Sequence, residues 1–199
     1  YLLGSTASGV AGQILDGGAG LDTVYYGAPR YNWQITRNSD GTVSAGSYYN
    51  WQPDQLIGVE RLLFSNGGYA LDIDGVGGQV YRLYQAAFDR RPDTPGLGLW
   101  MDAMDKGASL HSVAEAFVGS AEFGRLYGSA PSDAEFVRLL YSNVLNRTPD
   151  AAGNSFWLEH LANGATRASL LVNFSESAEN TTAMATIIGN GFEYTPYGG

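Results

Sequence analysis

The sequence contains no cysteine, and this absence excludes disulfide bonds, zinc–thiolate centres and thiol nucleophiles. It contains only two histidines, His111 and His160, and their wide separation argues against zinc catalysis and Ser–His chemistry. No run of 18 apolar residues occurs, so no transmembrane helix is predicted. The first residues carry neither a methionine nor a signal peptide, and we expect the chain to be part of a longer protein.

Basic residues are also scarce. Lysine occurs once, at Lys106, and 11 basic residues stand against 20 acidic ones, which gives a net charge of −9. An acidic chain without a basic run has few groups that can replace the counterions of nucleic acids or anionic lipids. The sequence therefore predicts no nucleic-acid partner, whereas its acidity suits either simple solubility or the binding of a cation.

Glycine, aspartate, asparagine, serine and aromatic residues are abundant over residues 1–78. Short alternations of apolar and polar residues there predict β-strands. Residues 31–44 read as a strand, a turn at 38–41 and a return strand, which is a hairpin pattern. Residues 62–71 read as a second hairpin, with its turn at 65–68. We therefore expect a small β segment over this part of the chain.

A helical period of apolar residues begins at Gln79 and continues to about residue 190. Residues 83–122 align without a gap with the residues 57 positions later. Such a match indicates one unit of three to four helices that has been duplicated, and we place the repeats at 80–130 and 136–187. The matched pairs include Leu83/Leu140, Tyr84/Tyr141, Arg90/Arg147, Pro92/Pro149, Asp93/Asp150, Gly96/Gly153, Trp100/Trp157, Phe117/Phe174, Ser120/Ser177 and Glu122/Glu179.

Each repeated residue has a structural use. In the first repeat, Pro92 stops a helix because it lacks an N–H donor, and Gly96 allows a close approach of the backbone. Trp100 is expected to enter the core, Gly107 to end the second helix and Ser120 to cap the last one. The same reasoning applies 57 residues later. The repeat is therefore predicted to be a structural unit and not a catalytic motif.

Residues 17–25 match the nonapeptide Gly-Gly-x-Gly-x-Asp-x-U-x, in which U is a large apolar residue, here Val24. The glycines permit a sharp turn that points carbonyl oxygens at a cation, the aspartate adds a carboxylate, and the last triplet forms a short strand. Oxygen ligands of this kind suit Ca²⁺. The alternative is a glycine-rich hairpin without a metal. The predicted metal ligands are Asp16, Gly17, Gly18, Gly20 and Asp22.

The nonapeptide resembles those of RTX proteins, the large calcium-binding products of type I secretion. The segments 54–64 and 71–75 resemble the β cap that often follows such repeats. The helical part resembles the domain of unknown function 4214, whose Arg-x-Pro-Asp-x-x-Gly-x-x-x-Trp signature starts at Arg90 and again at Arg147. The resemblance implies calcium-assisted folding outside the cell, in a family with no established activity. The single intact nonapeptide departs from the long repeat arrays of RTX proteins.

Two weaker candidate sites remain. Tyr48, Tyr49 and Trp51 lie in a polar loop, where aromatic rings suit stacking on sugars or contact with a protein partner; core packing is the alternative. Residues 72–75, Asp-Ile-Asp-Gly, resemble the opening of a calcium loop but lack its later carboxylates. A linker turn is the better interpretation of that segment.

The expected fold is therefore α+β, with a β segment at 1–78, a helical domain at 79–190 and a tail at 191–199. The expected function is a secreted, non-enzymatic surface or adhesion module that folds with Ca²⁺. Its expected partners are further copies of itself, in a layer or filament, or extracellular matrix polysaccharide. One alternative is the secretion and folding region of an enzyme whose active site lies upstream of Tyr1. Another is a carbohydrate-binding module.

Overall fold

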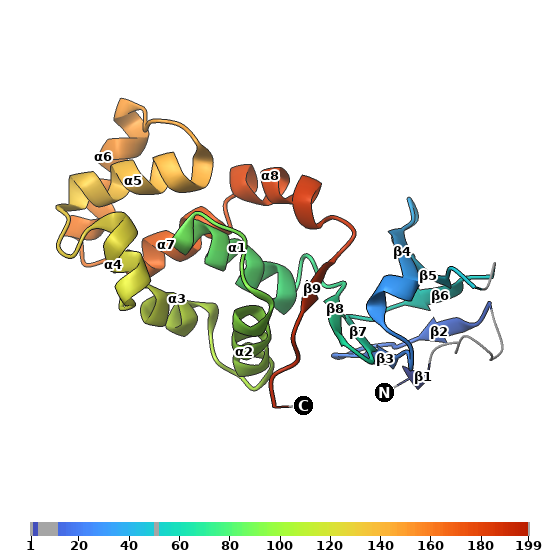
Figure 1. Ribbon diagram of the computed structural model, residues 1–199. Coiled ribbons are helices and arrows are strands. Elements are labelled where there is room, and N and C mark those ends of the chain that lie inside the picture. Colours follow the sequence, from blue (N-terminus) through green and yellow to red (C-terminus); the bar gives the residue numbers. More distant parts are fainter. Residues whose placement is uncertain (1, 4–11, 50–51, 199) are drawn as a thin grey trace. The chain divides into compact units, whose positions relative to one another are not determined.

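The computed structural model describes residues 2–3, 12–49 and 52–198, which form two compact units (Figure 1). The β unit comprises Tyr1–Gly77, Thr94–Leu99 and Ile188–Gly199, and the helical unit comprises Gly78–Asp93 and Trp100–Ile187. The α+β class predicted from the sequence is confirmed. Neither unit is continuous in the sequence, however, which differs from the predicted division into a β segment, a helical domain and a tail.

The β unit contains two sheets. One has the strand order β1-β3-β7-β8-β9 and the other has the order β2-β6-β5-β4. The strands are β1 (Leu2–Leu3), β2 (Ile14–Asp16), β3 (Thr23–Tyr25), β4 (Trp33–Arg37), β5 (Val43–Ser47), β6 (Asp54–Ile57), β7 (Arg61–Phe64), β8 (Gly67–Ala70) and β9 (Phe192–Tyr194). A short 3₁₀ helix, Arg30–Asn32, precedes β4.

The chain alternates between these two sheets. It passes from β1 in the first sheet to β2 in the second and back to β3, and after the β4–β5 hairpin it repeats the path through β6 and β7. The resulting pairs β1/β3, β3/β7 and β2/β6 are all parallel. We call strands β1, β2, β3, β6 and β7 the parallel coil. The sequence patterns predicted the hairpins but not this coil.

The two sheets share one core. Val24, the apolar residue of the nonapeptide, is fully buried, as predicted. It is paired with Leu62 of the next turn of the coil. The rings of Tyr26 and Trp33 are 4.1 Å apart at their centroids. Residues from both sheets complete the cluster, namely Leu15, Ile35, Val43, Ala45, Leu56, Val59, Phe64, Tyr69 and Leu71.

One buried carboxylate ties the coil together. Asp54 at the start of β6 is fully buried. Its side chain accepts hydrogen bonds from the Gln13 backbone N–H at 3.1 Å and from the Tyr26 hydroxyl at 3.1 Å. Burial, followed by the charge and hydrogen bond of Asp54, raises the pKa of Tyr26 far above its ordinary value. The phenol therefore stays a proton donor to the carboxylate over the whole physiological range.

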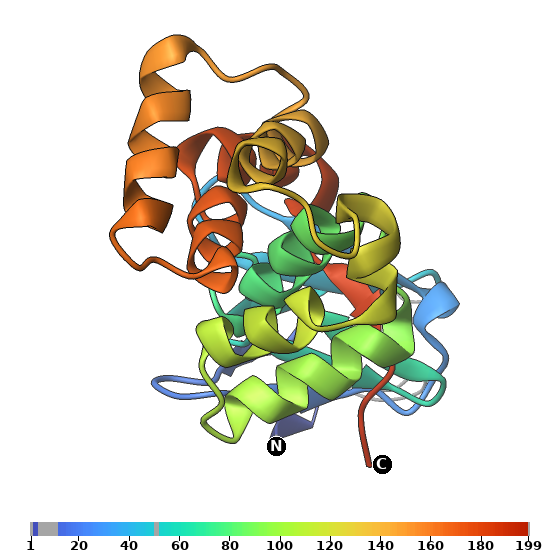
Figure 2. The same cartoon turned by 90° about the vertical axis from the view of Figure 1, so that its left-hand side faces the viewer.

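The chain after β8 is mostly helical, as the green, yellow and orange coils of Figure 2 show. Its eight helices have start points that repeat at the predicted interval. α1, α2, α3 and α4 begin at residues 76, 94, 110 and 121, and α5 to α8 begin 57 residues later, at 133, 151, 167 and 178. The duplication is thus confirmed, with four helices per repeat. The helices are α1 (Val76–Phe88), α2 (Thr94–Asp105), α3 (Leu110–Val118), α4 (Ala121–Tyr127), α5 (Asp133–Leu145), α6 (Ala151–Ala162), α7 (Arg167–Ser175) and α8 (Ala178–Ile188).

The third helices of the two repeats, α3 and α7, pack against each other. Their buried faces include Val113, Phe117, Leu170 and Phe174. Trp100 lies with its ring centroid 5.3 Å from Phe117, and the equivalent rings in the second repeat are 5.2 Å apart. The tryptophans occupy equivalent places, as predicted, but they lie at the margin of the core and are partly buried.

An arginine–glutamate pair occurs in both repeats. The Arg90 Nε donates to Glu122 Oε1 at 2.7 Å, and the Arg147 Nε donates to Glu179 Oε1 at 2.8 Å. A second guanidinium nitrogen of each arginine reaches the other carboxylate oxygen. Each guanidinium also lies over the tyrosine six residues earlier, at 5.1 Å from Tyr84 and 4.8 Å in the second repeat. These bidentate pairs explain the repeated Arg, Tyr and Glu without any catalytic role.

We expect the two pairs to stabilise the helical unit only above mildly acidic pH. The hydrogen bonds from the arginines lower the pKa of Glu122 and of Glu179 in the folded protein. Their stabilisation is therefore present above the unfolded pKa of about 4.3 and lost as the pH falls through the lower folded pKa. Glu122→Gln and Glu179→Gln should each cost about 0.5 kcal/mol at pH 7, because the pairs are exposed, and almost nothing at pH 2.5. Urea unfolding at the two pH values measures this, and an equal cost at both would contradict the assignment.

Three boundaries differ from the sequence-based predictions. The turn of the second hairpin is only Ser65 and Asn66, since Phe64 pairs directly with Gly67. The predicted repeats 80–130 and 136–187 start too late, because α1 begins at Val76 and α5 at Asp133. The predicted tail at 191–199 contains β9, which pairs antiparallel with β8. Its alternating burial, with Phe192 and Tyr194 inward, supplies the driving force.

Candidate functional site

The nonapeptide forms the turn that carries the chain from β2 in one sheet to β3 in the other. Gly18 has a φ of 76° and Gly20 a φ of 120°, conformations that residues with a Cβ rarely adopt. The side chain of Asp16 accepts a hydrogen bond from the Gly18 N–H at 3.0 Å and so closes the start of the turn. The prediction of a sharp glycine turn followed by a short strand is confirmed.

The carboxylate of Asp22 lies beside the glycines of the turn. A Cβ built on Gly17 would lie 2.6 Å from the Cβ of Asp22 and 2.9 Å from its carboxyl carbon. A Cβ on Gly20 would lie 3.9 Å from the Asp22 carboxylate. Only a glycine-lined backbone leaves room for this side chain. The turn therefore holds the Asp22 side chain close to Gly17.

A second carboxylate, which sequence reasoning missed, lies next to Asp22. The Asp22 N–H donates to the Glu60 side chain at 2.8 Å, and the Glu60 N–H donates back to the Asp22 carbonyl at 3.1 Å. These residues are 38 positions apart and meet only because β3 and β7 are parallel neighbours. No local pattern around Glu60 signals this contact, since it depends on the register of the coil.

The following turn of the coil packs closely on the glycine turn. The Gly17 N–H donates to the Ile57 carbonyl at 2.9 Å. A Cβ on Gly58 would lie 2.9 Å from the Gly18 carbonyl oxygen, and Gly58 itself has a φ of 57°. The two turns therefore touch through backbone on this side and leave no space for an ion between Gly18 and Gly58.

The atoms that the glycine turn could offer as ligands are of the type that Ca²⁺ binds. Asp22, Glu60 and the backbone carbonyls are all oxygen donors, which a hard cation prefers. Within the described residues, however, no group of three or more histidines, cysteines, aspartates or glutamates converges. Asp16 is engaged in closing the turn. Among the described residues, Asp22 and Glu60 are the carboxylates at this turn that could contribute to a cation site.

The second acidic loop has a structural role. Asp72 forms a buried ion pair with Arg61 and accepts a hydrogen bond from the Gly77 N–H at 2.7 Å. That N–H belongs to the first turn of α1, where a carboxylate is favourable. Asp74 is exposed. The interpretation of residues 72–75 as a linker turn and not a calcium loop agrees with this geometry.

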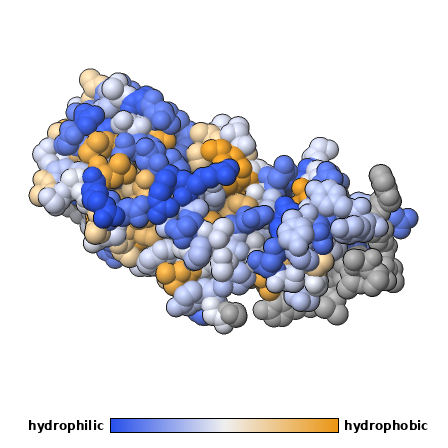
Figure 3. All heavy atoms as spheres, in the orientation of Figure 1, coloured by the Kyte–Doolittle hydropathy of each residue, from blue (hydrophilic) through white to orange (hydrophobic). Residues whose placement is uncertain are grey.

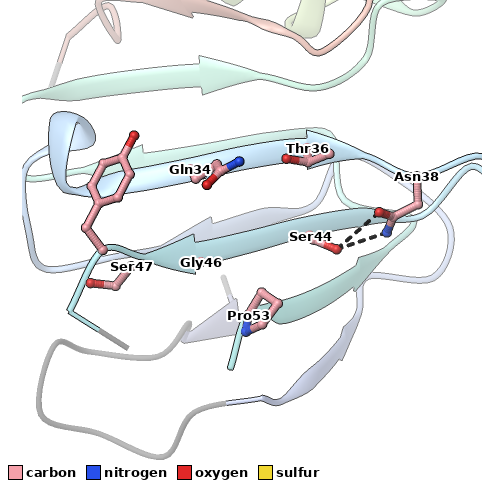
Figure 4. Close-up of a pocket in the computed structure, with 8 residues that line it drawn as sticks. Gln34, Thr36, Asn38, Ser44, Gly46, Ser47 and Pro53 are labelled. Carbon is pink, nitrogen blue, oxygen red and sulfur yellow. Dashed lines mark hydrogen bonds between the residues drawn. The ribbon is translucent and has the colours of Figure 1, made fainter. Parts of the chain in front are cut away.

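The sequence allowed two roles for the loop of Tyr48, Tyr49 and Trp51, namely contact at the surface or packing in the core. Tyr48 is 66% exposed and Tyr49 is 73% exposed, so core packing is wrong for both. Trp51 lies outside the described residues. Tyr48 also borders a hollow of about 520 Å³ on the outer face of the β4–β5–β6 sheet. Its lining consists of Gln34, Thr36, Asn38, Ser44, Gly46, Ser47, Tyr48 and Pro53 (Figure 4).

Elsewhere, exposed apolar side chains lie among hydrophilic ones on the face shown in Figure 3. Over the whole surface of the helical unit, the exposed apolar residues include Leu126 and Phe156. Among the described residues, every helix is too short or too polar to cross a lipid bilayer. The sequence-based expectation of no membrane-spanning helix is met for this part of the chain.

Comparison with known families identifies the helical part. A family model described as a domain of unknown function, DUF4214, matches residues 78–123 and again residues 114–184. The two matches cover both repeats and together more than half of the chain. Among curated proteins, none matches the sequence significantly. From the duplicated four-helix unit, its paired arginine–glutamate contacts and these matches, we conclude that the chain belongs to the DUF4214 family.

Proposed function

We propose that this chain is a non-enzymatic extracellular module in which Ca²⁺ completes the folding of a β coil, as in RTX proteins. The observation that carries the proposal is the parallel coil itself. The nonapeptide turn joins strands of two different sheets, and each strand pairs in parallel with the strand one turn later. A hairpin would pair the strands on either side of the turn with each other, so the geometry favours a roll over the alternative hairpin.

The helical unit supports a structural role for the rest of the chain. The arginines, tyrosines and glutamates that define the repeat contact one another and the core. The repeated serines Ser120 and Ser177 cap helices by accepting from backbone N–H groups. A duplicated scaffold in the same chain as a calcium-dependent coil suits a surface or adhesion module that works as an anchor or spacer.

We expect Ca²⁺ to raise the thermal stability of the β unit. The side chain of Asp22 lies against the glycines of the turn, where a bound cation would neutralise its carboxylate. A site that only the folded state offers adds about 2.7 kcal/mol when the ion exceeds its dissociation constant a hundredfold. The measurement is thermal unfolding in EGTA and in millimolar Ca²⁺, with near-UV circular dichroism from the buried Trp33 as the signal.

Two variants test whether the stabilisation by Ca²⁺ arises at the glycine turn. Asp22→Ala should lose the response to Ca²⁺, because it removes the principal side-chain ligand. Asp74→Ala removes an exposed carboxylate from the other acidic loop and should retain the full response. Identical melting of the wild type in EGTA and in Ca²⁺ would refute the calcium proposal, as would an undiminished response in Asp22→Ala.

A further inference from the structure

The hollow on the β4–β5–β6 sheet is built on a rigid floor. Along β4 the inward residues Trp33 and Ile35 are buried, whereas Gln34 and Thr36 point outward. Thr36 pairs with Ser44 of β5 in the antiparallel register, and Gln34 pairs with Gly46. Backbone hydrogen bonds on both sides of β5 thus hold the lining residues in two cross-strand rows. Figure 4 shows these side chains on neighbouring strands around one open space.

One row is a fixed array of amides and hydroxyls. The Asn38 side-chain amide donates to Thr42 Oγ1 at 2.8 Å and to Ser44 Oγ at 3.0 Å. The Gln55 amide, on β6, donates to the same Ser44 oxygen at 3.1 Å. Inside this network Ser44 Oγ uses both of its lone pairs and its proton, whereas the Asn38 carbonyl oxygen keeps a lone pair for a ligand. The network orients these side chains before any ligand arrives, which lowers the entropic cost of binding.

The other row, in which Gln34 pairs with Gly46, leaves space above the sheet. Gly46 carries no side chain, and a Cβ placed there would contact Pro53 at 3.4 Å. Gln34 stands on the opposite strand of this row, and the exposed ring of Tyr48 lies just after β5. The floor of the hollow therefore has a residue without a side chain, Gly46, and the Gln34 amide, the Pro53 ring and the Tyr48 ring lie around it. The volume of about 520 Å³ is in the range of small-molecule sites.

The absence of charge on the residues that line the hollow indicates which class of ligand it can bind. None of the eight residues that line the hollow carries a charge at neutral pH, although the chain as a whole has a net charge of −9. Ionic ligands are usually held by charged partners, so this hollow suits a neutral one. A peptide added as a strand would use the edge of the sheet, whereas these groups lie on its face.

We propose that this face of the β4–β5–β6 sheet binds a segment of an uncharged polysaccharide. Sugar hydroxyls both donate and accept hydrogen bonds and so match the side-chain amides of Asn38 and Gln34. The apolar face of a sugar ring stacks on the Tyr48 ring. The inference deepens the proposed role as an adhesion module and rests on it for the extracellular setting. It does not depend on calcium.

The test is native electrophoresis of the whole chain through gels that contain one polysaccharide each. Hydroxyethyl cellulose and a water-soluble β-1,3-glucan serve as neutral probes and alginate as the anionic comparison, and an array of neutral oligosaccharides widens the search. We expect retardation by at least one neutral probe. Tyr48→Ala should weaken binding about tenfold, and Gly46→Leu, which fills the hollow, should abolish it.

Tyr31→Ala is the matched control, because Tyr31 is 73% exposed on the same unit and lies outside this hollow. It should bind like the wild type, and circular dichroism checks that every variant is folded. The absence of neutral-glycan binding in both gels and array overturns the inference. So does retardation by alginate alone, or undiminished binding by both Tyr48→Ala and Gly46→Leu. Running each gel in EGTA and in Ca²⁺ separates a failure of this inference from a failure of the calcium proposal.

Discussion

Replacing Arg82 by alanine should destabilise the helical unit by about 3 kcal/mol. Arg82 is 5% exposed. Its Nε donates to Glu176 Oε1 at 2.8 Å and a second guanidinium nitrogen donates to Oε2 at 2.6 Å. The pair joins α1 of the first repeat to the end of α7 in the second, 94 positions away. Without the arginine, a largely buried carboxylate stays at a helix C-terminus, where the helix dipole also disfavours it.

The Arg82–Glu176 pair has no counterpart at the equivalent positions of the repeat, so its removal tests one defined contact between the repeats. The equivalent positions in the repeat are Leu139 and Gly119, so only one such link exists by sequence, and the other repeat cannot compensate. The double variant Arg82→Met/Glu176→Leu should recover most of the lost stability, because apolar residues of similar size often replace a buried ion pair at little cost.

Urea unfolding followed by circular dichroism at 222 nm, which reports mainly on helix, measures the effect. Arg138→Ala is the matched control. Arg138 forms a comparable bidentate pair with Glu135, but half of its side chain is exposed, and its loss should destabilise the protein far less than the loss of Arg82. If Arg82→Ala is as mild as Arg138→Ala, the link between the repeats contributes little.

Gly17→Ala should destabilise the β unit by about 2 to 3 kcal/mol. The new methyl group would collide with the Gly58 carbonyl oxygen and lie 2.6 Å from the Cβ of Asp22. Neither neighbour can move freely, because Gly58 belongs to the next turn of the coil and the Asp22 backbone is hydrogen-bonded to Glu60. The two turns would have to separate, which breaks the contact from the Gly17 N–H to Ile57.

Gly27→Ala provides the control, since nothing lies within 4 Å of a Cβ at that position and its φ is not positive. It should be neutral or slightly stabilising, because alanine restricts the unfolded chain. Hydrogen exchange over residues 12–30, together with thermal unfolding, separates the two variants. Equal melting temperatures for Gly17→Ala and Gly27→Ala would mean that the turns of the coil are not in close contact.

Predictions from local patterns were the most successful. Helix starts, caps and stops depend on residues within a few positions, and so Ser120 and Ser177 were recognisable as caps. Gly107 and Gly164, with φ values of 103° and 95°, follow the ends of α2 and α6, as predicted. Where tertiary contacts set the boundary, as for the two-residue turn at Ser65 and Asn66, the sequence pattern was too coarse.

The candidate sites also contain both kinds of feature, some that local sequence predicts and some that only tertiary contacts create. The glycine turn and its carboxylate Asp22 could be identified from spacing alone, because the motif is continuous. Glu60 could not, because its place beside Asp22 follows from the pairing of β3 with β7. The hollow beside Tyr48 likewise combines residues from β4 and β5, from the chain just after each of them, and from the chain before β6, and only the exposed tyrosine was suggested by the sequence.

By itself, the sequence determined the α+β division, the duplication at an interval of 57 residues and the sharp turn of the nonapeptide, because each depends on periodicity or on the backbone freedom of nearby residues. Tertiary structure alone decided the parallel coil, the addition of β9 to β8, and the ion pair between Arg82 and Glu176. Each of these joins segments far apart in the sequence. Their pairing is selected by which apolar faces are buried together and which charges then meet, and no local pattern encodes that choice.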